Sequence, residues 1–287
     1  MPELPEVESV RRQLAPLLRG RRVTAVWRDP YPARRLGELS ALVGRRVVDV
    51  GRRGKFLLIG LEPGDLELVC HLGMTGGFSP VARDALSDDL ARTVLEHDDD
   101  ASAERAHDRV RLALDDDTVL AFRDPRRFGR MQLVPAGDHA AVPTLAALGP
   151  EPLSDGFDPQ EFAARLARGR VAVKARLLDQ RLVAGVGNIY ADEALWRAGI
   201  HPGARRIGRD RAHRLHAAVR EVLAAAIERE GTTFRDYRAV NGESGRFASE
   251  LEAYGRAGRP CRRCGTTMRR SIVAGRGTTH CPGCQRA

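Results

Sequence analysis

The pattern of apolar and polar positions divides the chain into a strand-rich first half and a helical second half. Val7, Val10 and Leu14 recur at helical spacing, which predicts a helix over 3–19 that ends at Gly20. The next segments are short, apolar and separated by turn residues. They read RVTAVWR, GRRVVDVGRR, GKFLLIGL, DLELVCHLG, RVRLAL, TVLAFRD and GRMQLVP. One helix followed by many short strands predicts an antiparallel sandwich or barrel.

The second half changes to helical periodicity. Helices are expected at 158–168, 171–183, 188–198 and 208–230. The expected domains are a strand-rich domain at 1–134, a linker rich in Pro, Gly and Ala at 135–157, a helical domain at 158–253 and a cysteine-containing tail at 254–287. The acid-rich stretch 83–108 lacks periodicity, so we expect a solvated, mobile loop there.

The charge composition of the chain indicates which class of molecule it could bind. Lys plus Arg number 47 against 38 acidic residues, a net charge of +9, which suits a polyanion such as nucleic acid without proving one. No apolar run reaches the roughly 18–20 residues of a membrane span, and the start lacks a secretory signal, so no membrane partner is expected. Lysine occurs only at Lys55 and Lys174. Codon bias explains most of this skew, yet an amine that can lose its proton can serve where arginine cannot.

The tail carries two C-x2-C pairs. Its cysteines are Cys261, Cys264, Cys281 and Cys284. Two such turns close a tetrahedral site, which predicts one structural zinc ion, with a redox dithiol pair or unstructured cysteines as the alternatives. Between the pairs, RRSIVAGRGTTH predicts a hairpin with Arg276 at its tip. Cys70 lies in an apolar run, which predicts a buried thiol.

Three further motifs are compatible with nucleic-acid contact, and each also has a purely structural interpretation. AGVGN places Asn188 at a helix start, where backbone N–H groups favour an anion or form an ordinary cap. In FRDPRRFGR, Arg126, Arg127 and Phe128 would project from a loop, the composition of a nucleic-acid wedge or of a solvated basic turn. HLGM offers His71 and Met74, although such a run is more often core.

The opening MPELPEVE also holds candidate chemistry. If Met1 is removed, Pro2 becomes a secondary amine whose pKa lies near that of an α-amino group, about 7.7–8.0. Such an amine can attack an aldehyde-like carbon and form an iminium, with Glu3 moving protons. A start without chemistry is the ordinary alternative for a proline at this position.

Taken together, the motifs resemble the formamidopyrimidine-DNA glycosylase family over nearly the whole chain. The resemblance rests on MPELPEVE, RRGKFLL, HLGMTG, DPRRFG, LGPEPLS, VGNIYADEALW, YGR and the cysteine tail. It implies an α+β multidomain fold with an N-terminal helix on a two-layer antiparallel β-sandwich. A helix–two-turn–helix domain and a C-terminal zinc finger would follow. The segment 233–248 falls where family members carry a variable loop over the extruded base.

The resemblance also implies roles for matching positions. Pro2 would be the Schiff-base nucleophile, Glu3 the proton shuttle and Glu6 a support for the amino terminus. Lys55 would be the catalytic lysine, which contacts phosphate near the lesion, and Lys174 would be a second lysine of the catalytic site, near the damaged nucleotide. The remaining matches divide into phosphate contacts at His71, Arg127, Asn188 and Arg276, and gap-filling or duplex-kinking residues at Met74, Arg126 and Phe128.

The implied activity is base-excision repair of oxidised purines such as 8-oxoguanine and formamidopyrimidines. The base is flipped out and excised through the Pro2 Schiff base, and the abasic site is cleaved by β,δ-elimination. An endonuclease VIII-like enzyme for oxidised pyrimidines is the nearest alternative, although those tend to begin PEGPE. A non-catalytic lesion-binding paralogue and a zinc-ribbon RNA-binding protein are further alternatives. We expect a monomer acting on double-stranded DNA in the bacterial cytoplasm, associated with the nucleoid.

Overall fold

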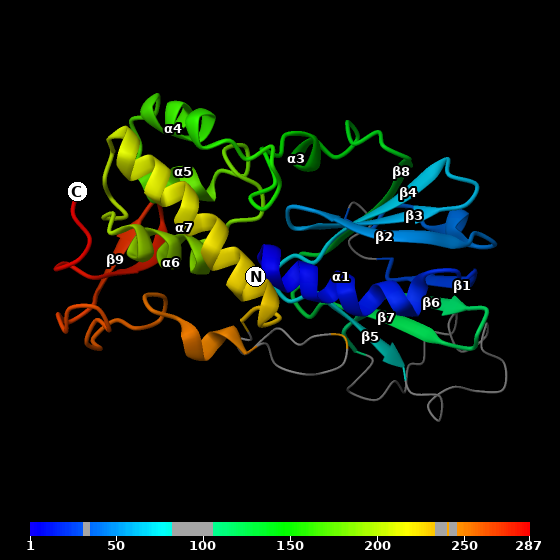
Figure 1. Cartoon of the computed structure of the whole chain (residues 1–287). Coiled ribbons are helices and arrows are strands. Elements are labelled where there is room, and N and C mark those ends of the chain that lie inside the picture. The colour runs from blue at the N-terminus through cyan, green and yellow to red at the C-terminus, as the bar shows by residue number, and fades with distance from the viewer. Residues whose placement is uncertain (31–34, 82–105, 233–239, 241–245) are drawn as a thin grey trace. The chain divides into compact units, whose positions relative to one another are not determined.

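The computed structural model describes residues 1–30, 35–81, 106–232, 240 and 246–287, coloured along the chain in Figure 1. Contacts divide it into two compact units. Unit 1 comprises Met1–Pro2, Glu6–Ala146 and Thr233–Gly245, and unit 2 comprises Glu3–Pro5, Ala147–Thr232 and Arg246–Ala287. Most of the expected loop at 83–108 and of the segment 233–248 lies outside the described residues. The four-part domain division stays a prediction.

Unit 1 holds two four-stranded antiparallel sheets beside helix α1 (Leu4–Leu18), the helix that the sequence predicts at 3–19. One sheet has the order β1-β6-β7-β5, with β1 at Val23–Arg28, β5 at Gly77–Val81, β6 at Asp108–Leu114 and β7 at Val119–Arg123. The other has the order β2-β3-β4-β8, with β2 at Val47–Arg53, β3 at Phe56–Leu61, β4 at Leu66–His71 and β8 at Arg130–Pro135. Short helical turns η1 (Ser40–Leu42) and α3 (Pro143–Ala146) complete the unit.

The core of unit 1 joins the helix to both sheets. Val10 of α1, Ile59 of β3 and Phe122 of β7 belong to one cluster of buried apolar side chains, and α1 runs beside strands of both sheets (Figure 1). Burying each such side chain stabilises the fold by roughly 1.5–3 kcal/mol relative to leaving it exposed. The expected β-sandwich with an N-terminal helix is therefore confirmed. Cys70 is fully buried in this cluster, and burial raises the pKa of its thiol.

Two details of unit 1 differ from the sequence prediction. Strand β5 was not predicted, because Pro80 interrupts its pattern; it is an edge strand, the position where a sheet tolerates proline. Asp108 was assigned to a solvated loop, but it begins β6 and is buried. Its carboxylate pairs with Arg111 and Arg123 at 3.1 and 3.0 Å, which compensates the buried charge.

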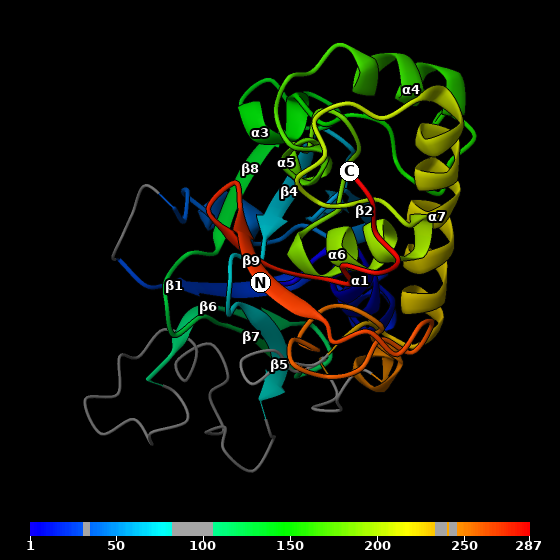
Figure 2. The ribbon, with the colours of Figure 1, turned by 90° about the vertical axis from the view of Figure 1, so that its left-hand side faces the viewer.

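Unit 2 is helical. Its elements are α4 (Pro159–Ala167), α5 (Val173–Leu178), α6 (Asn188–Ala198), α7 (Arg209–Glu228) and η3 (Phe247–Glu250). Helix α5 is shorter than the expected 171–183, because the chain becomes extended at Asp179. Figure 2 shows α7 passing beside α6, and their apolar faces share one buried cluster that includes Tyr190 and Leu215. No helix in the described ranges is long and apolar enough to cross a membrane.

The cysteine-containing tail of unit 2 forms the expected hairpin. Strands β9 (Arg269–Val273) and β10 (Arg276–His280) pair across a two-residue turn, Ala274–Gly275, in which both residues have positive φ. Arg276 was predicted at the tip. It lies one step beyond the turn, as the first residue of β10 and opposite Val273.

Candidate functional site

The four cysteines of the tail come together as a possible metal site. Their Sγ atoms all lie within 4.8 Å of one another. The Sγ atoms of Cys264 and Cys281 are 3.5 Å apart, and those of Cys261 and Cys284 are 3.9 Å apart. Four thiolates around a tetrahedral zinc ion would be about 3.8 Å apart for Zn–S bonds of about 2.3 Å. The donor set and its geometry therefore fit a closed, four-coordinate structural metal site.

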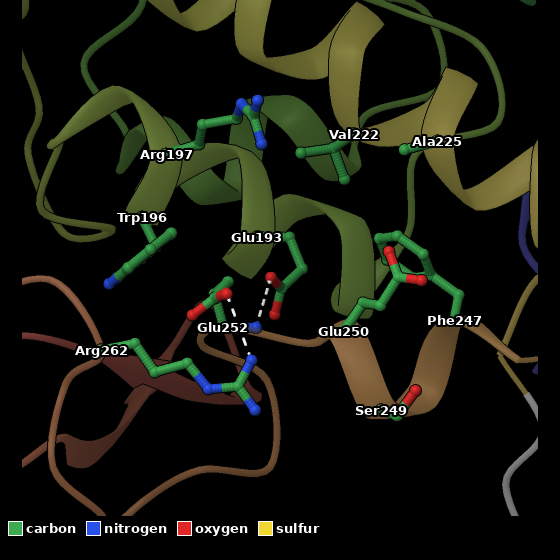
Figure 3. A pocket seen from close by; sticks show the side chains of 10 residues that line it. All are labelled: Glu193, Trp196, Arg197, Val222, Ala225, Phe247, Ser249, Glu250, Glu252 and Arg262. Carbon is green, nitrogen blue, oxygen red and sulfur yellow. Dashed lines mark hydrogen bonds and ion pairs between the residues drawn. The ribbon is translucent and has the colours of Figure 1, made fainter.

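Helix α6 holds the chain that leads into this cluster. The Glu193 carboxylate accepts hydrogen bonds from the backbone N–H groups of residues 252, 253 and 254 at 2.9, 2.9 and 2.7 Å. Figure 3 shows Glu193 reaching from α6 towards this segment. One turn further, the Trp196 indole N–H donates to Cys261 Sγ at 3.4 Å. Such donors to a metal-binding sulfur orient the ligand, so α6 fixes both the entry segment and one cysteine.

A pocket beside Glu193 is lined by several charged side chains (Figure 3). These charges are engaged with one another or with neighbours: Arg262 with Glu252, Arg197 with Glu221, and Glu250 with Arg229. The pocket therefore offers paired charges rather than ones poised for a ligand.

The start of α6 binds an anion, and that anion belongs to the chain itself. Glu3 Oε1 and Oε2 accept from the backbone N–H groups of Ile189 and Tyr190 at 2.9 and 3.4 Å. Gly187 caps the helix, and a Cβ there would lie 2.2 Å from Glu3 Cδ. The glycine therefore makes room for the carboxylate, which the helix dipole favours in its ionised form. This arrangement fixes the predicted proton shuttle in place.

Lys174 is fully buried in unit 2. Its ammonium lies 2.7 Å from Asp192 Oδ1 and donates to Thr278 Oγ1 at 2.7 Å and to the Gly277 carbonyl at 3.3 Å. Burial lowers the pKa of Lys174, and the Asp192 carboxylate opposes that shift. Asn188 donates from Nδ2 to the same Gly277 carbonyl at 3.0 Å. Lys174 and Asn188 are thus brought together with the strand that begins at Arg276.

Lys55 and His71 form the basic part of unit 1's candidate site. Lys55 is buried, in the turn between β2 and β3, and His71 ends β4. His71 Nδ1 accepts from the Gly73 N–H at 3.0 Å, which assigns the ring proton to Nε2 as a donor. Burial, helped by the charges of Lys55 and Arg130, lowers the pKa of His71 to about 4. A neutral imidazole donor beside a buried ammonium suits a phosphate oxygen.

The loops carrying Met74 and Phe128 lie against each other in unit 1. A Cβ on Gly73, which has a positive φ of 69°, would lie 2.5 Å from the Phe128 carbonyl carbon. The backbone N–H of Arg126 donates to Thr75 Oγ1 at 3.3 Å, which adds a second link. Met74 and Phe128 are each 37% exposed and are among the few large apolar side chains that the described residues expose. Two exposed apolar probes on adjoining loops fit the predicted wedge.

Arginines flank these probes. The guanidinium of Arg126 lies 5.1 Å from the centre of the Phe128 ring, and that of Arg35 lies at the same distance. Arg127 has a positive φ of 55°, its backbone N–H donates to the Asp124 carbonyl at 3.1 Å, and its guanidinium lies 3.3 Å from Asp29. The loop thus holds Arg127 in a defined conformation and leaves Arg126 exposed.

The amino terminus of unit 1 contains the remaining predicted residues. Pro2 is buried two residues before α1, Glu6 lies buried in the first turn of that helix, and Met1 is 55% exposed. The Pro2 nitrogen is part of an amide bond while Met1 remains attached. Met1 is exposed and so accessible to removal, which would free the Pro2 amine.

Sequence reasoning missed the buried carboxylates that organise these loops. Asp124 is buried, and its Oδ2 accepts from the Gly129 N–H at 2.6 Å across the DPRRFG loop. Asp192 and Glu193 are buried in the middle of α6. A signal existed for the last two, because IYADEALW is apolar on both sides of the acidic pair, the pattern of a helix buried all round. Asp124 carried no comparable signal, since Asp-Pro is common in ordinary turns.

These features define a class of protein. A closed four-cysteine cluster, exposed apolar side chains beside arginines, the basic pair Lys55 and His71, and a net charge of +9 are features of a protein that binds nucleic acid.

Comparison with known proteins narrows this class. Residues 1–131 match the model of the formamidopyrimidine-DNA glycosylase N-terminal domain, and residues 148–238 match that of its H2TH domain. The formamidopyrimidine-DNA glycosylase of Deinococcus radiodurans is 46% identical, covering 99% of this chain and 97% of that protein. The chain belongs to the formamidopyrimidine-DNA glycosylase family, whose members have DNA glycosylase and abasic-site lyase activity.

Solved structures agree with this assignment. The crystal structure of the MutM (Fpg) protein from Thermus thermophilus is similar to the chain with a TM-score of 0.85 and 46% identity, covering 99% of this chain and 98% of that one. A variant of Lactococcus lactis Fpg in complex with Fapy-dG-containing DNA has a TM-score of 0.85 and 34% identity, with full coverage of both chains (100% and 100%). The likeness therefore extends over both units.

Proposed function

We propose that this chain excises oxidised purines, 8-oxoguanine and formamidopyrimidines, from double-stranded DNA and then cleaves the abasic site by β,δ-elimination. The observation that carries the proposal is the amino terminus. Pro2 is buried beside Glu3, and the Glu3 carboxylate is held by backbone N–H groups of α6. Relatives were solved with DNA containing Fapy-dG, a carbocyclic 8-oxoguanine and an oxidised pyrimidine, which supports lesion-containing DNA as the substrate. The choice of a purine rests on the PELPE start, on the complete DPRRFG motif and on Met74.

In the proposed reaction, the neutral Pro2 amine donates its electron pair to the sugar C1′. The C1′–N bond to the base breaks, and the base leaves with that bonding pair and takes up a proton. Opening of the sugar ring then gives an iminium between Pro2 and C1′. Glu3 is suited to carry protons in these steps because it is a fixed carboxylate next to the nucleophile in sequence.

The iminium makes the following eliminations easier, because it draws electrons from the neighbouring carbons. Loss of the C2′ proton expels the 3′ phosphate, and loss of the C4′ proton expels the 5′ phosphate. Water then hydrolyses the iminium and releases the free amine. Glu6, buried in the first turn of α1, supports the amino terminus during this cycle.

Phosphate binding falls to the basic groups. We assign contacts to Lys55, His71, Arg127, Asn188 and Arg276. His71 serves as a neutral donor through Nε2, since its lowered pKa of about 4 keeps it uncharged near neutral pH. Lys55 then supplies the positive charge. For Lys174, which the family resemblance places near the damaged nucleotide, its burial against Asp192 supports a role in holding the structure around the nucleotide.

A flipped-out nucleotide leaves a gap in the duplex. Met74 and Phe128 are proposed to fill this gap and to kink the duplex, because they are exposed apolar side chains on adjoining loops. Arg126 is proposed to bond to the orphaned partner base. The tail cysteines are proposed to hold one structural zinc ion; because all four positions are taken by sulfur, the ion has no role in the chemistry.

The direct test is excision from three matched duplexes, carrying 8-oxoguanine, a formamidopyrimidine or thymine glycol. We expect strand cleavage of the first two to exceed that of thymine glycol. The reverse order would favour an enzyme for oxidised pyrimidines, and tight binding without cleavage of any duplex would favour a non-catalytic paralogue. We infer that the protein acts as a monomer on the chromosome in the cytoplasm of a bacterium.

A further inference from the structure

The edge of strand β10 is held by side chains from two helices of unit 2. A two-stranded ribbon is marginal by itself, and β9 covers only one edge of β10. On the other edge, the Thr279 N–H donates to Asp192 Oδ2 at 2.9 Å. The Gly277 carbonyl accepts from Lys174 and Asn188 at 3.3 and 3.0 Å. These side chains take the place of a third strand.

The Lys174–Asp192 pair lies at the centre of this arrangement. Both side chains are 0% exposed, and their charged atoms are 2.7 Å apart. Lys174 also donates to Thr278 Oγ1 at 2.7 Å, and that hydroxyl donates to the Arg276 carbonyl at 3.0 Å. A chain of contacts therefore runs from the buried pair to the backbone of Arg276.

We propose that Asp192, through its buried pair with Lys174, is a positioning residue that fixes the first residues of β10 and so holds Arg276 at its phosphate. The proposal rests on the function proposed above for Arg276. It assigns Asp192, which lies in the VGNIYADEALW motif and has had no role so far, a part in DNA binding without contact to DNA. It also gives a reason for lysine at position 174, one of only two lysines in the chain, since a fully buried site suits a compact ammonium.

The test combines amide hydrogen exchange with DNA binding on the full chain. In Asp192→Ala, peptides covering 276–280 should exchange at least tenfold faster than in the parent, while peptides covering β3 should not change. The matched control is Glu221→Gln, which removes an exposed carboxylate of α7 that pairs with Arg197 of α6. The control should exchange like the parent. Zinc content and the melting temperature report whether each variant is folded.

DNA binding is measured on a duplex with a tetrahydrofuran abasic analogue at several salt concentrations. Each neutralised phosphate contributes about 0.9 to the slope of log K against log salt, so Arg276→Ala should lower the parent's slope by about one. In the Asp192→Ala background the same change should alter the slope by close to zero, because Arg276 is already displaced. A loss of stability alone would not remove this dependence on Arg276.

The proposal would be overturned if the amides of 276–280 exchange as slowly in Asp192→Ala as in the parent and if Arg276→Ala still lowers the salt slope of DNA binding by about one in that background. If Asp192→Ala does not fold, the variant Asp192→Ala/Lys174→Met removes both charges, and the same expectations apply to it. An Arg276→Ala change without effect on the parent's slope would instead contradict the phosphate contact proposed above. The exchange of 276–280 would then still decide whether the buried pair fixes β10.

Discussion

Arg126 is the residue that we expect to read the base opposite the lesion. A guanidinium only donates hydrogen bonds, so it suits cytosine, which presents the acceptors O2 and N3 on its pairing edge. Adenine presents a donor there and would be met poorly. We therefore predict that 8-oxoguanine is excised faster opposite cytosine than opposite adenine. One good discriminating contact is worth about 1–3 kcal/mol, so the preference should be roughly tenfold or more.

Arg35 provides the matched control for this prediction. Its guanidinium lies 5.1 Å from the Phe128 ring centre, the same distance as that of Arg126. Single-turnover excision should show that Arg126→Ala is slower and has a flattened preference, while Arg35→Ala keeps the preference. If Arg126→Ala discriminates as sharply as the parent, another residue reads the opposite base.

We expect His71 to make the free energy of unfolding depend on pH. Its pKa in the folded protein is about 4, lowered by burial and by the charges of Lys55 and Arg130, against about 6.5 when exposed. Between these two pH values the unfolded chain binds more protons, so the free energy of unfolding should rise as pH increases from about 4 to 6.5 and then level off. We expect this contribution to be about 1–3 kcal/mol.

Urea melts across this pH range measure the effect. The free energy of unfolding should rise less with pH in His71→Gln than in the parent, and as much as in the parent in the exposed-turn control His107→Gln. Equal rises in parent and His71→Gln would mean that His71 is not the group responsible.

At the scale of elements, the start of α6 gives a sharp test of how Glu3 is held. Gly187 and Gly208 are both helix-capping glycines in extended conformations that alanine can adopt. A Cβ on Gly187 would lie 2.2 Å from Glu3 Cδ, whereas Gly208 has nothing within 4 Å. We predict that Gly187→Ala displaces the carboxylate, lowers the free energy of unfolding by roughly 1–3 kcal/mol and reduces excision at least tenfold.

Gly208→Ala serves as the control because it shares the loss of a capping glycine, which should cost about 1 kcal/mol or less. Its excision rate should equal that of the parent. Equal rates for Gly187→Ala and the parent would show that the position of Glu3 against α6 is not needed for the reaction.

Much of this architecture could be predicted from sequence because its signals are local. The helical spacing of Val7 and Val10 predicted α1, and the two C-x2-C pairs predicted a four-cysteine cluster. The scarcity of lysine marked Lys55 and Lys174, which are both buried. The contacts that organise the site are not local. Glu3 meets Ile189 across 186 positions of the chain, and no pattern in either segment indicates that pairing.

On the scale of the whole molecule, we predict one zinc ion per chain and a tail that folds only with it. The tail contributes few apolar side chains, so metal binding should supply much of its folding energy. Cys264→Ser should lose zinc and abolish specific DNA binding, since the segment that presents Arg276 would unfold. Elemental analysis and binding to lesion-containing duplex measure both effects.

Cys70→Ala is the control for the zinc prediction, because it removes a buried cysteine of unit 1 that lies outside the cluster. It should retain one zinc ion per chain and specific DNA binding, although loss of packing will lower its stability. Active protein that contains no zinc would contradict the assignment of the metal.

The central claim is that Pro2 is the nucleophile, and borohydride trapping tests it most directly. The enzyme is incubated with a duplex carrying 8-oxoguanine opposite cytosine, borohydride is added, and the cross-linked peptide is mapped by mass spectrometry. We predict a covalent complex through the Pro2 nitrogen, with Met1 absent, and little trapping in Pro2→Gly or in a chain with an added residue before Pro2. A cross-link that maps to Lys55, or excision that proceeds with Met1 still attached to Pro2, would contradict the account.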